Sequence, residues 1–233
     1  MRTRNAALRE HCDGPGADPG VVRDTLESLA RLNAGLLRTH ALALGRIRPF
    51  LRPGASLRVL DLGCGAGDLG RALVRAGARN GCRVEVLGVD LSPEAVALAR
   101  SLAVPGDGTS FERGDALGPA PDPAGFDLVV SSFLLHHLPD DGAAAGVLRR
   151  SARARIGFVH LDLVRSRAAW LLFRLVGRSF VARRETWEDG LTSIRRCWTA
   201  REMASLAAGA APGAEVEVRF PWRLRVSRLS SSA

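Results

Sequence analysis

Within residues 59–70, three glycines stand at every second position directly after a short, largely apolar stretch. Gly63, Gly65 and Gly67 follow residues 59–62, and the pattern after them predicts a helix. A strand that runs into a glycine-rich turn and a helix places backbone N–H groups against a nucleotide-like ligand. Residues 65–70 also match the GxGxxG pattern of dinucleotide-binding proteins, but a single match of this kind is a weak signal.

Acidic residues at intervals around this turn narrow the class of ligand. Asp61 stands two residues before the first glycine, and Asp90 and Asp115 come after later apolar stretches. A dinucleotide site needs an acid about 20 residues beyond the glycines, at the end of the second strand, to bind the ribose. Glu85 has about this spacing but lies inside the predicted strand, whereas Asp90 closes it. We therefore choose Asp90 as the ribose ligand.

Three histidines and one aspartate near the ends of two later strands are the candidate catalytic residues. His136 and His137 lie within residues 133–140, and His160 and Asp162 share one face of a following strand by period two, at the edge where a substrate should lie. Imidazole titrates near neutral pH and can act as a general base. Because adjacent residues on a helical turn point in different directions, we expect at most one of His136 and His137 to face the site.

Strands and helices alternate from residue 57 onward. Strands are predicted at 57–62, 83–89, around Phe111, at 126–130 and at 156–161, and helices at 68–78 and 93–101, the latter capped by Ser92. This alternation predicts a doubly wound α/β fold, a mostly parallel sheet with helices on both faces. Ligands of such sheets bind at the carboxyl ends of the strands.

Four segments resemble, in order, the successive motifs of class I S-adenosylmethionine-dependent methyltransferases. They are residues 59–67, 88–92, 114–116 and 126–131, so the resemblance covers about residues 57–163. The combination is much more specific than any one motif. It implies a Rossmann-like sheet, S-adenosylmethionine as the cofactor and S-adenosylhomocysteine as its product.

The resemblance also implies a role for each matching residue on the methionine half of the cofactor. A cationic sulfonium ligand without phosphates favours carboxylates around it and needs no Lys or Arg. Asp61 would position the methionine half, together with the backbone of Gly63, Cys64, Gly65 and Gly67. The backbone carbonyls of Ser131 and Ser132 would face the methionine ammonium group.

On the adenosine half, the resemblance assigns four further residues. Asp90 would bind both ribose hydroxyls, and Leu91 would pack on the adenine ring. Asp115 would accept a hydrogen bond from the adenine amino group, and Ala116 would supply a backbone N–H. No metal site is expected, because the cysteines form no CxxC or other zinc-type spacing.

The methyl acceptor is indicated by weaker resemblances. The double-histidine segment 133–140 is similar to one in small-molecule methyltransferases of the quinone-biosynthesis type. Residues 29–33, 162–166 and 189–196 resemble segments of methyltransferases found with bacterial polyketide synthases. No Asn/Asp-Pro-Pro-Tyr or Phe motif, which amino-group methylases of nucleic acids often carry, follows the fourth predicted strand. These features favour an oxygen or carbon of a phenolic or polyketide-like metabolite of secondary metabolism.

The flanking segments predict a cover over this site. One or two helices are expected between residues 18 and 50, a helix at 166–176, an ordered loop at 183–197, and a helix after the capping box at Thr199. Residues 215–220 and 223–226 predict an antiparallel hairpin at the sheet edge. Trp170, Phe173 and Trp187 would help the apolar helices to exclude water.

We expect a single domain over residues 1–233. Its expected parts are an N-terminal helical cover (1–54), the cofactor-binding core (55–165), a helical and loop cover of the substrate (166–200), and a final helix with the hairpin (201–233).

Composition leaves other functions open. The net charge is +9 and all 33 basic residues are Arg, but the arginines are spread along the chain and Lys, Gln and Tyr are all absent, which indicates codon bias. An RNA methyltransferase, a nicotinamide-dinucleotide oxidoreductase and a non-methylating or scaffold protein therefore stay as alternatives to a small-molecule enzyme. The four cysteines, without zinc-type spacing, predict reduced thiols in a cytoplasmic protein, and no secretory or membrane-spanning segment is expected. The oligomeric state stays open.

Overall fold

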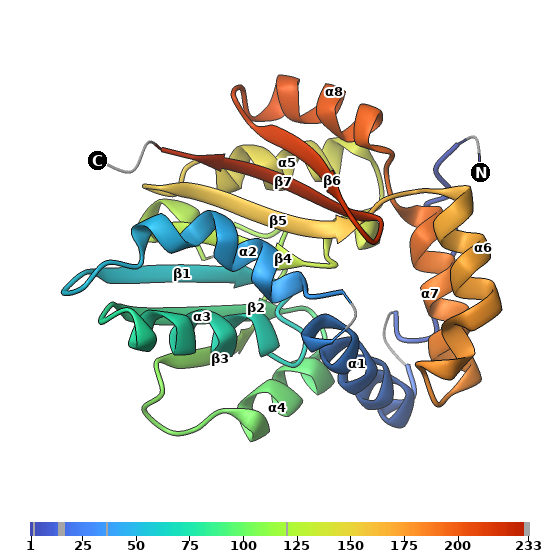
Figure 1. The fold of residues 1–233 in the computed structure, drawn as a ribbon, viewed down its shortest axis with the longest axis horizontal. Helices are drawn as coiled ribbons and strands as arrows, with labels where there is room; N and C mark the ends of the chain where they lie inside the picture. Colours follow the sequence, from blue (N-terminus) through green and yellow to red (C-terminus); the bar gives the residue numbers. More distant parts are fainter. Residues whose placement is uncertain (2, 14–16, 36, 120, 231–233) are drawn as a thin grey trace.

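One mixed sheet organises the structure, a computed structural model that describes residues 1, 3–13, 17–35, 37–119 and 121–230. Within these residues the strand order is β3-β2-β1-β4-β5-β7-β6 (Figure 1). Strands β1 to β5 are parallel, and β7 pairs antiparallel with both β5 and β6. Their bounds are β1 (Ser56–Leu62), β2 (Arg83–Asp90), β3 (Thr109–Arg113), β4 (Leu128–Ser132), β5 (Gly157–Leu163), β6 (Glu215–Arg219) and β7 (Arg223–Leu229). The predicted Rossmann-like sheet with an antiparallel C-terminal hairpin is confirmed.

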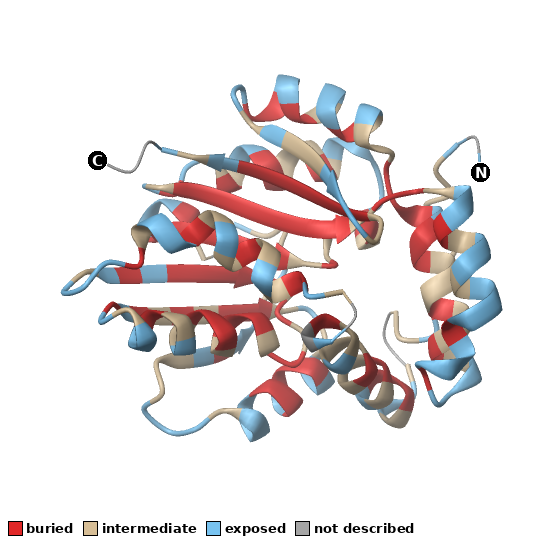
Figure 2. Cartoon of the chain, viewed as in Figure 1, coloured by how far each residue is buried: buried red, intermediate tan, exposed pale blue. Residues whose placement is uncertain are grey.

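Helices cover both faces of the sheet because its central strands are apolar on both sides. Val59 and Leu60 are adjacent in β1, yet they belong to separate clusters on opposite faces. Val59 packs with α2 (Thr39–Ile47) and α3 (Asp68–Arg79), whereas Leu60 packs with α5 (Asp141–Ser151) and α8 (Ala200–Ala210). Figure 2 shows the central strands buried and the outer faces of these helices exposed. A fifth helix, α4 (Pro93–Leu102), packs on β3 and β2.

Three helices lie beyond the carboxyl ends of the parallel strands (Figure 1). These are α1 (Pro19–Ala34), α6 (Arg167–Val176) and α7 (Arg184–Arg196), and α7 contacts both of the others. Asp18 caps α1 and Ser166 caps α6 through their side-chain oxygens, as expected of these residue types. This group of helices encloses the sheet edge at which ligands of such folds bind.

Short 3₁₀ turns complete the chain between the longer elements. They are η1 (Arg48–Phe50), η2 (Pro123–Gly125), η3 (Leu135–His137) and η4 (Gly177–Ser179). The turn η3 directly follows β4 and carries both candidate histidines. Among the described residues, no helix combines the length and the apolarity that crossing a membrane requires.

Two helices were not predicted. Residues 183–197 were expected to form a loop, and this prediction is wrong because α7 spans most of them. Its buried face is mostly polar, because it consists of Thr186, Asp189, Ser193 and Arg196 with Ile194 as the one apolar residue, so the segment has no clear apolar period to detect. The other helix, α5, is rich in Ala and Gly, and its N-cap is Asp140.

Candidate active site

The glycine-rich turn between β1 and α3 adopts a conformation that only glycine takes readily. Gly63 and Gly67 have φ angles of +63° and +74°. A Cβ atom at Gly67 would lie 2.5 Å from the Phe111 ring, and one at Gly63 would lie 2.9 Å from Leu134. The turn is therefore a tight backbone cradle at the carboxyl end of β1.

Asp90 closes β2 next to this cradle. Its Oδ2 accepts a hydrogen bond from the Gly65 N–H at 2.9 Å, and its Oδ1 accepts one from the Ser92 N–H at 3.0 Å. Burial raises the pKa of Asp90 above its ordinary value, while these two N–H groups and the nearby His137 partly oppose the shift. A carboxylate held in this way has acceptor capacity left for a pair of ribose hydroxyls.

Asp61 is a buried carboxylate whose surroundings suit the binding of a cation. The residue is 1% exposed, and neither side-chain oxygen has a hydrogen-bond partner among the described residues, although the Gly70 N–H approaches. Burial, together with the charges of Asp68 and Asp90, raises the pKa of Asp61 well above its ordinary value. Because an unpartnered buried carboxylate is costly, an ammonium or sulfonium group beside it would satisfy it.

The other residues expected at the cofactor divide into two groups. Leu91, Asp115, Ala116 and Ser132 line the same cavity as the glycine turn, and so do Cys64 and Asp90. The Asp115 Oδ1 accepts a hydrogen bond from the Leu117 N–H at 2.8 Å. Ser131 does not line the cavity, because its hydroxyl points into the protein interior and contacts His160.

A cavity of about 1390 Å³ extends from the glycine turn to the helices beyond the sheet. Its far wall is apolar and includes Val22, Leu26 and Leu29 of α1 and Leu172 and Phe173 of α6. Of the three aromatic residues expected in the cover, Phe173 lines the cavity, whereas Trp170 and Trp187 do not. The cavity thus has one carboxylate-rich end and one apolar end.

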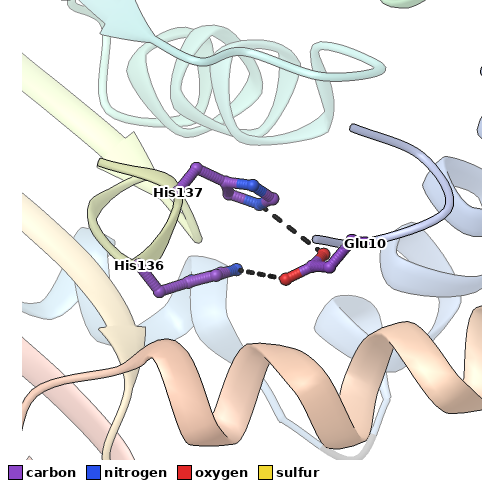
Figure 3. A group of neighbouring side chains, drawn as sticks. All are labelled: Glu10, His136 and His137. Atoms are coloured by element: carbon purple, nitrogen blue, oxygen red, sulfur yellow. Dashed lines mark ion pairs between the residues drawn. The ribbon is translucent and has the colours of Figure 1, made fainter. Parts of the chain in front are cut away.

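Both histidines of η3 point toward one carboxylate (Figure 3). Nε2 of His136 lies 3.7 Å from Oε1 of Glu10, and Nε2 of His137 lies 3.9 Å from Oε2 of the same residue. The other ring nitrogens also face acids, since Nδ1 of His136 is 2.7 Å from Asp162 and Nδ1 of His137 is 2.9 Å from Asp13. The expectation that at most one of these histidines faces the site is wrong. We call these five residues the histidine–carboxylate cluster.

The opposite charges of this cluster shift the pKa values of its members toward their ionised forms. Burial opposes the charged form of His137, but Glu10 and Asp13 outweigh it and raise the pKa of His137 to about 9. His136 and two backbone N–H groups lower the pKa of Asp162 despite its burial. The Arg196 guanidinium bonds to Asp13 and to the backbone carbonyls of His136 and His137.

His160 lies apart from the cavity, which corrects the expectation that it faces the substrate. Its side chain is fully buried, Nδ1 contacts the Ser131 hydroxyl at 2.8 Å, and Nε2 contacts the Ser151 hydroxyl at 3.0 Å. Burial lowers the pKa of His160 to about 3, so the ring stays neutral. The physical reason is the sheet geometry: this face of β5 is covered by α5, which carries Ser151. Asp162 does not line the cavity either, but it holds His136.

Sequence reasoning missed the residues that surround the histidines. Glu10 and Asp13 lie in an N-terminal segment without helix or strand, and Arg196 lies in the helix that was expected to be a loop. Glu10 and Asp13 stand in no recognisable motif, and Arg196 ends the segment 189–196, whose resemblance gave no role to this residue. The only signal was the presence of acids and an arginine in polar segments, which is normally a property of solvated surface.

Comparisons with known proteins agree with this geometry. Residues 59–155 match the family described as a methyltransferase domain. This region of the chain is therefore similar to a methyltransferase domain. That region holds the glycine turn, Asp61, Asp90 and Asp115, and S-adenosylmethionine is the cofactor of this family. The residues present fit it, since Asp61 and Asp90 both line the cavity, the Asp61 oxygens have no hydrogen-bond partner among the described residues, and the Gly65 and Ser92 N–H groups hold Asp90.

The chain has curated relatives in bacteria. The chain is 30% identical over 175 residues to a ubiquinone biosynthesis O-methyltransferase of Paraburkholderia phymatum, an alignment that covers 71% of this chain and 65% of the relative. A protein of the same name from Xylella fastidiosa is 33% identical over 137 residues, which cover 56% of this chain and 51% of the relative. The chain thus spans between about half and two thirds of the length of these relatives.

Solved structures show the same fold at low identity. Human N-acetylserotonin methyltransferase, solved in complex with SAM, is 17% identical with a TM-score of 0.63, over 91% of this chain and 56% of that one. A putative O-methyltransferase of Nostoc punctiforme is 18% identical with a TM-score of 0.62, over 97% of this chain and 64% of that one. These likenesses concern the fold alone.

Proposed function

We propose that this protein transfers the methyl group of S-adenosylmethionine to an oxygen of a small, largely apolar acceptor such as a phenolic or polyketide-like metabolite. One observation carries the proposal. A single cavity joins the cofactor cradle to the histidine–carboxylate cluster, and apolar side chains of α1 and α6 form much of its remaining wall. An acceptor in this cavity would present a hydroxyl group to His137 and pack its apolar part against α1 and α6.

The reaction in this cavity is a displacement at the methyl carbon. A lone pair of the acceptor oxygen forms the new C–O bond, and the C–S bond breaks with its electron pair on sulfur, which leaves neutral S-adenosylhomocysteine. Holding oxygen, carbon and sulfur in line supplies a large part of the rate. We propose that His137 hydrogen-bonds the acceptor oxygen, and that the hydroxyl proton passes to a carboxylate of the cluster.

Oxygen is the acceptor atom that the available observations favour, with carbon as the second choice. The curated relatives are named O-methyltransferases. Ser131, Ser132, Phe133 and Leu134 stand where amino-group methylases of nucleic acids often carry an Asn/Asp-Pro-Pro motif. All four cysteines are free, and a cytoplasmic location stays a prediction.

A labelled-methyl assay tests the proposal. The purified protein is incubated with methyl-labelled S-adenosylmethionine and a panel of phenols, polyketide-like phenolic compounds, a nicotinamide dinucleotide and RNA. We expect a mass shift of one methyl group on at least one phenolic compound. His137→Ala should abolish the shift while S-adenosylhomocysteine still binds, and His11→Gln is the matched control because His11 is half-exposed and pairs with Glu188 outside the cavity.

Other outcomes of the assay would replace the proposal. Label that appears in RNA would favour an RNA methyltransferase. Thermal stabilisation by a nicotinamide dinucleotide but not by S-adenosylhomocysteine would favour an oxidoreductase. Label that stays on the cofactor with every acceptor would favour a non-methylating or scaffold protein.

A further inference from the structure

We propose that Glu10, His136 and His137 bind a divalent transition-metal ion, and that the acceptor oxygen completes its coordination. The inference rests on the proposed function, because it gives the ion a role in acceptor binding. Sequence spacing predicted no metal site, since the carboxylate and the histidines come from distant parts of the chain. The tertiary structure brings them together at the wall of the cavity.

The three donor groups are spaced for an ion between them. Nε2 of His136 and Nε2 of His137 lie 3.7 and 3.9 Å from the two oxygens of Glu10, too far for direct hydrogen bonds. Ligand atoms at 2.0–2.1 Å from a tetrahedral Zn²⁺ are about 3.3 Å from one another. A small inward movement of the side chains would therefore close the set around an ion (Figure 3).

Each histidine already has the second partner that metal-binding histidines use. Nδ1 of His136 is 2.7 Å from Asp162, and Nδ1 of His137 is 2.9 Å from Asp13. A carboxylate on one ring nitrogen fixes the tautomer, so an ion that displaces the proton from the other nitrogen would bind the lone pair there. In both rings it is Nε2 that is left, and both Nε2 atoms face Glu10.

The charge of the surroundings also favours a cation. With neutral imidazole rings, carboxylates outnumber guanidinium groups around the site: the acids are Glu10, Asp13, Asp162 and Asp189, and the bases are Arg4 and Arg196. Three protein groups contact Glu10. Oε1 accepts a hydrogen bond from Ser193 at 2.9 Å and lies 3.6 Å from Arg196, and Oε2 accepts one from the Cys12 thiol at 3.8 Å. An ion would share Oε1 with Ser193 and Arg196 and would replace the thiol contact at Oε2.

The position of the site gives the ion a chemical role. The Glu10 side chain is 4% exposed, whereas His137 is 32% exposed and, like the other two ligands, lines the cavity. The open coordination position would therefore face the acceptor. A bound divalent ion lowers the pKa of an oxygen ligand. With the ion in place, it would hold the acceptor oxygen instead of the His137 hydrogen bond. The hydroxyl proton would pass to a carboxylate of the cluster, and the oxyanion would attack the methyl carbon as the C–S bond breaks with its electron pair on sulfur.

Metal binding is tested on the whole protein with Zn²⁺ and Co²⁺ as probes. Chelator-stripped protein is titrated with each ion, and metal content after gel filtration and Co²⁺ absorption are measured. We expect one ion per chain in the wild type and in the matched control His11→Gln, and affinity at least about tenfold lower in Glu10→Gln and His136→Gln. Binding of S-adenosylhomocysteine shows that each variant is folded.

Three results would overturn, in turn, the ion site, the role of the ion and the proposed function. Wild-type protein that retains no more Zn²⁺ than Glu10→Gln would overturn the ion site. Stripped protein that methylates its acceptor at the full rate, with no gain from added Zn²⁺, would overturn the role of the ion while the proposed function stands. Stoichiometric Zn²⁺ that depends on Glu10, without transfer of labelled methyl to any acceptor, would instead overturn the proposed function and keep the site.

Discussion

The carboxylate of Asp90 accepts a hydrogen bond from the backbone N–H of Gly65 at 2.9 Å. This contact joins the end of β2 to the middle of the glycine turn, so the acid and the cradle hold one another in place. The same carboxylate also accepts a hydrogen bond from Ser92 at the start of α4. The candidate ribose ligand is therefore oriented before any cofactor binds.

Asp90→Ala should weaken S-adenosylhomocysteine binding by about 100-fold or more, because two charge-assisted hydrogen bonds to the ribose would be lost. Isothermal titration calorimetry measures the change. Glu85→Ala is the matched control, since Glu85 lies in the same strand, pairs with Arg83 and does not line the cavity. A larger effect of Glu85→Ala than of Asp90→Ala would reverse the assignment of the ribose ligand.

Binding of S-adenosylhomocysteine should become tighter as the pH rises from about 4. In the free protein the pKa of Asp61 is raised, so this carboxyl group stays protonated up to a higher pH than an ordinary aspartate does. The ammonium group of the ligand favours the ionised form, and binding therefore releases the proton. The dependence should end once the pH exceeds the raised pKa of Asp61.

Two variants check the origin of this pH dependence. Asp61→Asn should reduce the slope of affinity against pH, because the titrating group is gone. Asp107→Asn should leave the slope unchanged, since Asp107 caps a turn before Thr109 and lies outside the cavity. Equal slopes in wild type and Asp61→Asn would show that another group is responsible.

Gly67→Ala should lower the free energy of unfolding by about 2 kcal/mol, because the position has a positive φ and the new Cβ would meet the Phe111 ring. Gly146→Ala is the matched control in α5. Nothing lies within 4 Å of a Cβ at Gly146, so this substitution should stabilise the protein by about 0.5–1 kcal/mol. Urea denaturation measures both changes. An unchanged free energy of unfolding in Gly67→Ala would show that the turn does not require glycine.

His160 should make the protein sensitive to mild acid. The folded pKa is lowered to about 3, whereas an unfolded histidine titrates near 6.5, so below that pH the unfolded state binds the extra proton. The contribution of His160 to stability should therefore fall by about 2 kcal/mol between pH 7 and pH 5. The stability of His160→Asn, measured by urea denaturation at both pH values, should change much less over this interval, although this variant is less stable at pH 7. If the stability of His160→Asn falls between pH 7 and pH 5 by as much as that of the wild type, groups other than His160 cause the acid sensitivity.

The positions of the candidate cofactor residues could be predicted because their signals are local. Gly63, Gly65 and Gly67 stand directly after β1, and Asp90 stands at the end of β2, so the alternation of strands and helices was sufficient to place them at one sheet edge. The ends of several elements were also visible, because Asp18, Ser92 and Thr199 are N-cap residues whose role depends only on the next few positions.

The acceptor half was decided by the tertiary structure. His136 and His137 were visible as candidates, but their partner Glu10 comes from a segment without periodicity, and Arg196 from a helix whose buried face is mostly polar. Hydrophobic patterns report apolar burial only, so a polar interface between distant segments leaves no trace in them. His160 shows the opposite case: its type and period indicated a catalytic role, whereas the helix packed on that face of β5 encloses it between two serines.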